Sequence, residues 1–219
     1  MIDNLTNKHI TALIDIGKRL NNLPTRQLDE LDPNKTALVI IDMVNGFTKT
    51  GLLSSPRAVA LIEPIVKLQR KAKERNIPII AFADTHTKDS TELKAYGEHC
   101  LKGTLEAEIV DEIKVVGGYK LIEKNSTNGY LEDKYQAWLK ENPNINTFIV
   151  VGVCSDICVL EFVLAQKADF DRKNKESTFI VPANMIDTFD SENHNGDLMN
   201  MFAQYKLITV GADVVKSIE

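Results

Sequence analysis

The chain has 219 residues, of which 43% are hydrophobic and 26% are charged, with a net charge of −5. These values are typical of a folded globular domain and argue against a disordered chain. The mildly acidic balance, with no basic stripe, argues against a nucleic-acid partner. No apolar run is long enough to cross a bilayer, so no membrane partner is expected.

Strand-like and helical segments alternate along the chain. The apolar spacing predicts a helix over 9–21, a strand over 36–43, a helix over 57–75 and a strand over 77–83. A long polar stretch over 84–118 follows, with a short helix predicted at 105–113. Beyond it we expect a strand over 120–123, a helix over 130–141, a strand over 147–153, a helix over 157–170, a strand over 178–181, a helix over 194–205 and a last strand over 207–210.

This alternation predicts an α/β fold. Continuous apolar runs such as 36–43 are typical of strands that are buried on both faces of a parallel sheet. We therefore expect a three-layer α/β/α domain over 36–219, with a mostly parallel, Rossmann-like central sheet. Residues 1–35 are interpreted as a helical N-terminal extension.

Reactive or metal-ligating side chains follow four successive predicted strands. They are Asp42, then Asp84 with His86, then Lys124, then the segment 154–158. Ligands bind beyond the carboxyl ends of the strands in open α/β sheets, so these side chains are expected at one edge. This coincidence is the main indication of function in the sequence.

Cys158 is the candidate nucleophile. It is predicted to lie in the first turn of a helix, where free backbone N–H groups and the helix dipole stabilise an anion. We therefore expect a thiol pKa below the free value of about 8.5. The same N–H groups could hold an oxyanion during acyl transfer. The alternative is a buried structural cysteine.

Asp42 and Lys124 are the candidate partners of this thiol. A partly desolvated carboxylate at Asp42 can accept the thiol proton, and Lys124 can stabilise the resulting charges. The alternative interpretation is a structural ion pair between these two residues. The other two cysteines are Cys100 and Cys154, and three thiols without a secretion signal favour a reducing, cytoplasmic location.

The segment after the second strand is a candidate metal site. Asp84 and His86 lie on the same side of an extended segment, and Glu92 and His99 follow. Carboxylate and imidazole ligands suit zinc, iron or manganese. The pattern is a weak signal by itself, because histidines are also common at protein surfaces.

Four blocks of sequence resemble the nicotinamidase-like cysteine hydrolases of the isochorismatase-like family. The blocks are VIIDMVNGF at 39–47, FADTH at 82–86 with EHCLKGT at 98–104, IEKN at 122–125 and VGVCSDICV at 151–159. The cysteine block is the most specific of them. The resemblance covers residues 36–215 and implies the isochorismatase-like hydrolase fold.

The resemblance implies a role for each matching residue. Asp42, Lys124 and Cys158 match the catalytic triad, and Phe47 matches an aromatic residue that packs against the substrate ring. The peptide bond before Cys154 is expected to be cis, which would direct the N–H groups of Cys154 and Cys158 to the oxyanion.

The resemblance also implies a metal and a substrate. Asp84, His86 and His99 match the ligands of a divalent metal, with zinc as the leading candidate, and Glu92 matches a further ligand of some nicotinamidases. The implied activity is hydrolysis of nicotinamide to nicotinate and ammonia, within NAD metabolism, by a cytoplasmic homo-oligomer.

One departure from the family pattern concerns the substrate. Thr85 stands where many nicotinamidases have tryptophan, which leaves a related amidase or ureidase acting on a carbamoyl compound as the main alternative. A vinyl-ether hydrolase would not need Cys158. A catalytically silent binding domain would be expected to lack an intact triad, and a nucleotide-binding protein would be expected to carry a glycine-rich phosphate loop.

Overall fold

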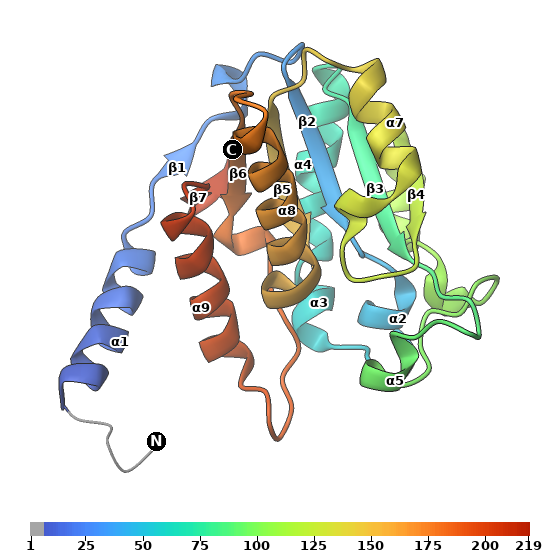
Figure 1. Ribbon diagram of the computed structural model, residues 1–219, viewed down its shortest axis with the longest axis horizontal. Coiled ribbons are helices and arrows are strands. Elements are labelled where there is room, and N and C mark those ends of the chain that lie inside the picture. Colours follow the sequence, from blue (N-terminus) through green and yellow to red (C-terminus); the bar gives the residue numbers. More distant parts are fainter. Residues whose placement is uncertain (1–6) are drawn as a thin grey trace.

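The computed structural model describes residues 7–219, so the first six residues of the predicted extension lie outside it (Figure 1). The helices are α1 Asn7–Asn21, α2 Asn45–Thr48, α3 Pro56–Ala60, α4 Ile62–Glu74, α5 Leu93–Tyr96, α6 Asp111–Val116, α7 Asp133–Glu141, α8 Leu160–Arg172 and α9 Gly196–Thr209. The strands are β1 Thr25–Arg26, β2 Thr36–Ile41, β3 Ile79–Asp84, β4 Tyr119–Lys124, β5 Thr147–Gly152, β6 Thr178–Pro182, β7 Asp213–Val215 and β8 Ser217–Ile218.

The central sheet has the order β4-β3-β2-β5-β6-β7, and all of its strand pairs are parallel. The chain runs outward from β2 through β3 to β4, then returns to β5 on the other side of β2. The switch point therefore lies between β2 and β5, where α/β sheets of this kind bind ligands. This topology confirms the predicted α/β fold.

Helices cover both faces of the sheet, which explains the continuous apolar strands. In β2, Leu38 and Ile40 pack in a cluster with residues of α4, while Val39 and Ile41 pack in a second cluster with residues of α7 and α8. All six β2 side chains are buried. Figure 1 shows α7 and α8 on one side of the sheet and α4 on the other.

The segment before the sheet packs at the edge of the molecule. Helix α1 lies beside α9 (Figure 1), and no residue of α1 is buried. The short strand β1 pairs with β8 near the C-terminus. Among the described residues, no helix is both long and apolar enough to cross a membrane.

Three predicted elements are wrong in detail. The run 207–210 is not a strand, because α9 continues to Thr209 and the last sheet strand is β7. The helix predicted at 105–113 is a 3-10 turn at Leu105–Ala107 followed by α6. The helix predicted over 57–75 is divided at Leu61 into α3 and α4.

Candidate active site

The sheet brings the predicted site residues to one edge. Asp84 and Lys124 are the last residues of β3 and β4 and are register partners. Asp42 follows β2 directly, in the left-handed conformation with a φ of 52°. Cys158 lies in a π-helical turn at Ser155–Val159, just beyond β5. Parallel pairing of these strands thus assembles side chains that are distant in sequence.

Lys124 is the centre of this group. Its Nζ lies 2.9 Å from Oδ2 of Asp42 and 2.6 Å from Oδ1 of Asp84. It also donates to the carbonyl of Ser126 at 3.0 Å and lies 3.7 Å from Sγ of Cys158. Lys124, Asp42 and Asp84 are all at most 1% exposed. The structure therefore brings together the three residues that were predicted as a triad, together with Asp84.

Burial and the lysine set the ionisation of the group. Burial raises the pKa of Asp42 from 3.8 to about 6, although the ammonium of Lys124 acts in the opposite direction. Burial disfavours the charged form of Lys124, but the carboxylates of Asp42 and Asp84 raise its pKa well above the usual value. Lys124 is therefore the permanent cation of the site, and Asp42 titrates near neutral pH.

The prediction of a lowered thiol pKa for Cys158 is wrong. Burial raises the pKa of this thiol well above its usual value. The ammonium of Lys124 acts in the opposite direction, and the carboxylates of Asp42 and Asp84 raise the pKa further. Cys158 is thus a thiol at rest and needs a base. Apart from the ion pair with Lys124, neither oxygen of Asp42 has a hydrogen-bond partner among the described residues. Asp42 can therefore accept a proton.

The turn that carries the cysteines depends on close backbone contacts. We call residues 153–159 the cysteine turn. The peptide bond between Val153 and Cys154 is cis, as the family resemblance implies. Gly152 before it has a φ of 116°, and a Cβ there would come within 2.0 Å of the carbonyl oxygen of Ile41. Only glycine fits at this position. The close approach of Gly152 to Ile41 lets the cysteine turn pack against the end of β2.

Three predicted metal ligands converge beside the triad. Oδ2 of Asp84 lies 2.9 Å from Nε2 of His86 and 3.1 Å from Nε2 of His99. The ligand atoms of all three residues lie within 4.8 Å of one another, and the three side chains are buried. Glu92 does not belong to this group, but its Oε1 is 3.7 Å from Nε2 of His86.

This geometry fits a divalent cation. Ligand atoms of a tetrahedral zinc ion with bonds of about 2.0–2.1 Å lie about 3.4 Å apart, close to the separations seen here. The second ring nitrogen of each histidine contacts a neighbouring polar group. Nδ1 of His99 donates to the carbonyl of Gly97 at 2.9 Å, and Nδ1 of His86 lies 3.2 Å from Oδ1 of Asn125. Such outer hydrogen bonds orient histidines toward a metal.

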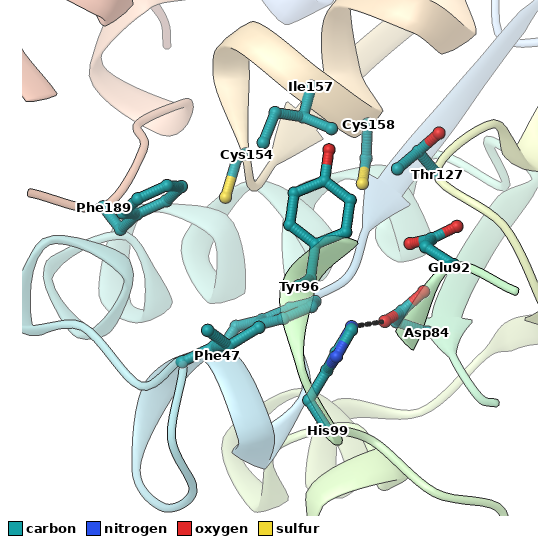
Figure 2. A pocket seen from close by; sticks show the side chains of 11 residues that line it. Phe47, Asp84, Glu92, Tyr96, His99, Thr127, Cys154, Ile157, Cys158 and Phe189 are labelled. Atoms are coloured by element: carbon teal, nitrogen blue, oxygen red, sulfur yellow. Dashed lines mark ion pairs between the residues drawn. The ribbon is translucent and has the colours of Figure 1, made fainter. Parts of the chain in front are cut away.

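A cavity of about 60 Å³ opens beside both groups (Figure 2). Its lining includes predicted residues, namely Phe47, Asp84, Glu92, His99, Cys154 and Cys158, and others not assigned to the site from sequence, namely Leu53, Tyr96, Thr127, Ile157 and Phe189. In Figure 2 the ring of Tyr96 lies across the cavity, with its hydroxyl toward the cysteine turn.

The residues missed from sequence had little signal. Ile157 directly precedes Cys158, and this closeness in sequence was its only clue. Tyr96, three residues before His99, could be interpreted from the sequence either as closing the pocket near the metal or as packing the polar stretch. Phe189 reaches the cavity from a loop after β6, which no periodicity marks. Thr85 does not line this cavity. Its hydroxyl donates to the carbonyl of Ala83 at 3.0 Å, and its side chain lines a different cavity.

A buried thiol beside a carboxylate and a lysine, at the switch point of a parallel sheet, is the arrangement of an α/β cysteine hydrolase. The isochorismatase domain family matches residues 36–215, and the chain belongs to this family. The resemblance predicted from the sequence is thereby confirmed.

Known relatives support the same assignment. Nicotinamidase 1 of Arabidopsis thaliana is 32% identical over 158 residues, which cover 62% of this chain and 64% of that protein. The match therefore spans less than two thirds of that relative. The crystal structure of N-carbamoylsarcosine amidase from Thermoplasma acidophilum has a TM-score of 0.68 at 28% identity, covering 83% of this chain and 96% of that one.

A third relative was solved with a metal. The crystal structure of the pyrazinamidase of Pyrococcus horikoshii in complex with zinc has a TM-score of 0.67 at 21% identity, covering 83% of this chain and 99% of that one. At this identity the similarity establishes the shared fold. The buried group of Asp84, His86 and His99 is the place in this chain where a divalent metal would fit.

Proposed function

We propose that this protein hydrolyses nicotinamide to nicotinate and ammonia through a thioester on Cys158. The observation that carries the proposal is the buried position of Lys124, which contacts the thiol, the carboxylate of Asp42 and the ligand carboxylate of Asp84 at once. One residue thus joins the nucleophile, the base and the candidate metal group. A structural ion pair would not need a thiol or an adjoining cavity.

In the first half of the reaction, Asp42 accepts the proton of Cys158 while Sγ attacks the amide carbon. The carbonyl π electrons move to oxygen, and the backbone N–H groups of Cys154 and Cys158 stabilise the oxyanion. When the carbonyl re-forms, the C–N bond breaks and Asp42 returns the proton to the leaving nitrogen. Ammonia departs and the acyl group remains on sulfur as a thioester.

In the second half, a water molecule attacks the thioester. Asp42 accepts one proton from this water, and the same N–H groups hold the second oxyanion. The C–S bond then breaks, the acid is released, and the proton returns to Sγ of Cys158. Lys124 stays charged throughout and limits the cost of placing negative charge on neighbouring buried groups.

The candidate metal group positions the substrate. A divalent ion held by Asp84, His86 and His99 would supply a Lewis acid to a pyridine nitrogen or to an ordered water. Zinc is the proposed ion, and Glu92, close to His86, is the proposed further ligand. Asp84 also binds Lys124 through its other oxygen, so it fixes the distance between the metal group and the thiol.

The cavity walls support a flat aromatic amide. Phe47 and Tyr96 present rings beside His99, with ring centroids 5.8 Å and 6.4 Å from the imidazole. Aromatic side chains pack against other rings by offset stacking or edge to face, so these walls suit a planar aromatic substrate. Phe47 is therefore proposed as a substrate contact, as the resemblance implies, and Tyr96 supplies a second wall.

A carbamoyl amide is the second candidate substrate. The observation that favours it is that Thr85, at the position where many nicotinamidases have tryptophan, lines a different cavity and adds no aromatic side chain to this one. The similarity to N-carbamoylsarcosine amidase is consistent with this candidate. Such a substrate keeps the same attack by Cys158 but has no ring nitrogen to direct at a metal.

The remaining proposals follow from the family. We propose that residues 36–219 form the hydrolase domain, that the protein acts in the cytoplasm within NAD metabolism, and that it assembles as a homo-oligomer. Helix α1 packs beside α9 at the edge of the molecule, where it is available for such an assembly (Figure 1).

The test is ammonia release from nicotinamide by the purified protein, with metal content determined on the same sample. Wild-type protein should release ammonia and Cys158→Ala should not, with about one metal ion per chain. Release from carbamoyl compounds but not from nicotinamide would reject the nicotinamide proposal in favour of the second candidate. Equal release by both proteins would reject the thiol mechanism.

A further inference from the structure

The loop between β6 and α9 supplies one wall of the cavity. We call residues 186–195 the 186–195 loop. Phe189 from this loop lines the cavity on the side of Cys154 (Figure 2). Behind it, the imidazole of His194 stacks on the Phe189 ring, with centroids 3.9 Å apart and planes 11° apart. The orientation of this wall therefore depends on a histidine that does not itself line the cavity.

The same histidine binds the cysteine turn. Its Nε2 lies 2.8 Å from Oδ2 of Asp156, and its Nδ1 lies 3.0 Å from the carbonyl oxygen of Phe189. The ring thus bridges a backbone carbonyl of the loop and the carboxylate of Asp156. Asp156 stands between Cys154 and Cys158, the two residues whose N–H groups are the proposed oxyanion donors. His194 thus joins the oxyanion donors to the cavity wall.

Further hydrogen bonds join the loop to the cysteine turn and to α3. The N–H of Ser155 donates to the carbonyl of Asp187 at 2.8 Å. On the other side of the loop, Arg57 of α3 donates to the carbonyl of Thr188 at 2.9 Å and to Oδ1 of Asp187 at 2.7 Å. The loop is therefore fixed to the body of the protein independently of His194, which leaves the histidine contact free to be tested alone.

We propose that His194 is a positioning residue for amide hydrolysis, which holds the cysteine turn and the Phe189 ring in one fixed arrangement. The inference rests on the proposed function, because it assigns the N–H groups of the cysteine turn to the oxyanion. Loss of the imidazole leaves the Phe189 ring without its stacking partner and Asp156 without its hydrogen-bond partner. The oxyanion donors then move relative to Sγ of Cys158.

The experiment compares three variants. His194→Ala removes both contacts, His194→Gln keeps a side-chain amide donor for Asp156, and Glu192→Ala changes an exposed residue of the same loop. For each we measure kcat and KM for nicotinamide, the melting temperature, and the affinity for pyridine-3-carbaldehyde. The aldehyde adds the Cys158 thiol across its carbonyl, with S–C bond formation and proton transfer to oxygen, so it reports on the oxyanion donors without requiring turnover.

We expect His194→Ala to lower kcat and aldehyde affinity by about tenfold to a hundredfold, as small misplacements of reacting groups do. His194→Gln should recover most of this loss, and Glu192→Ala should match wild type. If His194→Ala has a much lower melting temperature, Asp156→Asn replaces it as the deciding variant, because it keeps the shape of the side chain. A merely structural role would lower the melting temperature without the loss in kcat and without rescue by glutamine.

The outcomes separate the two proposals. If nicotinamide is not hydrolysed but the aldehyde binds through Cys158 and His194→Ala weakens it, the substrate proposal fails and the positioning role stands. If kcat and aldehyde affinity of His194→Ala lie within twofold of Glu192→Ala, the positioning role is overturned. A wild-type protein that neither hydrolyses an amide nor binds the aldehyde would overturn both.

Discussion

Replacing Asp42 with asparagine removes the proposed base with little change in shape. The substitution exchanges one carboxylate oxygen for an NH2 group beside Lys124. Because general-base catalysis contributes about 10²–10⁴-fold, kcat should fall by that factor. Binding of substrate depends on the cavity walls, so KM should change little.

The same substitution lowers kcat but also changes the stability of the protein, in a favourable direction as the pH rises. The pKa of Asp42 is raised by burial from 3.8 to about 6, so ionising this carboxyl opposes folding. The stabilisation by the protonated form is complete below pH 3.8 and is lost as the pH rises through about 6. At about 1.4 kcal/mol per pKa unit, wild type loses about 2–3 kcal/mol between pH 4 and pH 7.5 from this group. The asparagine variant does not.

Urea unfolding of both proteins at pH 4 and pH 7.5 measures this difference. The variant should gain about 2–3 kcal/mol relative to wild type on going from the lower to the higher pH. The ion pair with Lys124 forms only when Asp42 is ionised, and its attraction is already contained in the pKa of about 6, so it adds no further pH dependence. A variant that keeps kcat within tenfold of wild type, or a stability difference that does not change with pH, would refute the reasoning.

Three further predictions concern the same site. The value of kcat/KM should fall about tenfold per pH unit below about pH 6, where Asp42 takes up a proton, and a flat pH–rate profile down to pH 5 would count against this base. Lys124→Met leaves two buried carboxylates without a cation, so it should lower the free energy of unfolding by about 3–5 kcal/mol and shift the acidic limb of the profile to higher pH. Full stability of this variant in a urea titration would argue against the buried ion pairs. His99→Ala should lower zinc affinity by at least about tenfold, measured by metal analysis after dialysis, while Cys158 still reacts with iodoacetamide; unchanged zinc content would remove His99 from the metal group.

Much of the fold was accessible from the sequence because parallel strands have a strong apolar signature. The runs at 36–43 and 147–153 are so continuous that only burial on both faces explains them, and they are the two strands at the switch point. The run 207–210 shows the limit of this reasoning. Its residues are apolar or β-branched, but α9 continues to Thr209, and Leu207 packs against the sheet as part of a helix. Tertiary packing here outweighs local β-propensity.

The site was only partly accessible from the sequence. Asp42, Lys124 and Cys158 follow strands, so topology alone placed them together. The ionisation of Cys158 could not be predicted, because it depends on how deeply the turn is buried rather than on its place at the start of a helix. The roles of Phe189 and His194 depend on a loop with no periodic pattern, whose course is set by contacts with Arg57 and the cysteine turn.

The central claim is that Cys158 forms a thioester with the acyl group of the substrate. Hydrolysis of nicotinamide and of methyl nicotinate in the presence of hydroxylamine tests this claim, because hydroxylamine competes with water for a shared acyl-enzyme. The account predicts the same ratio of hydroxamate to acid from both substrates, and neither product from Cys158→Ala above background. A ratio that depends on the leaving group, or hydroxamate formation without the thiol, would contradict it.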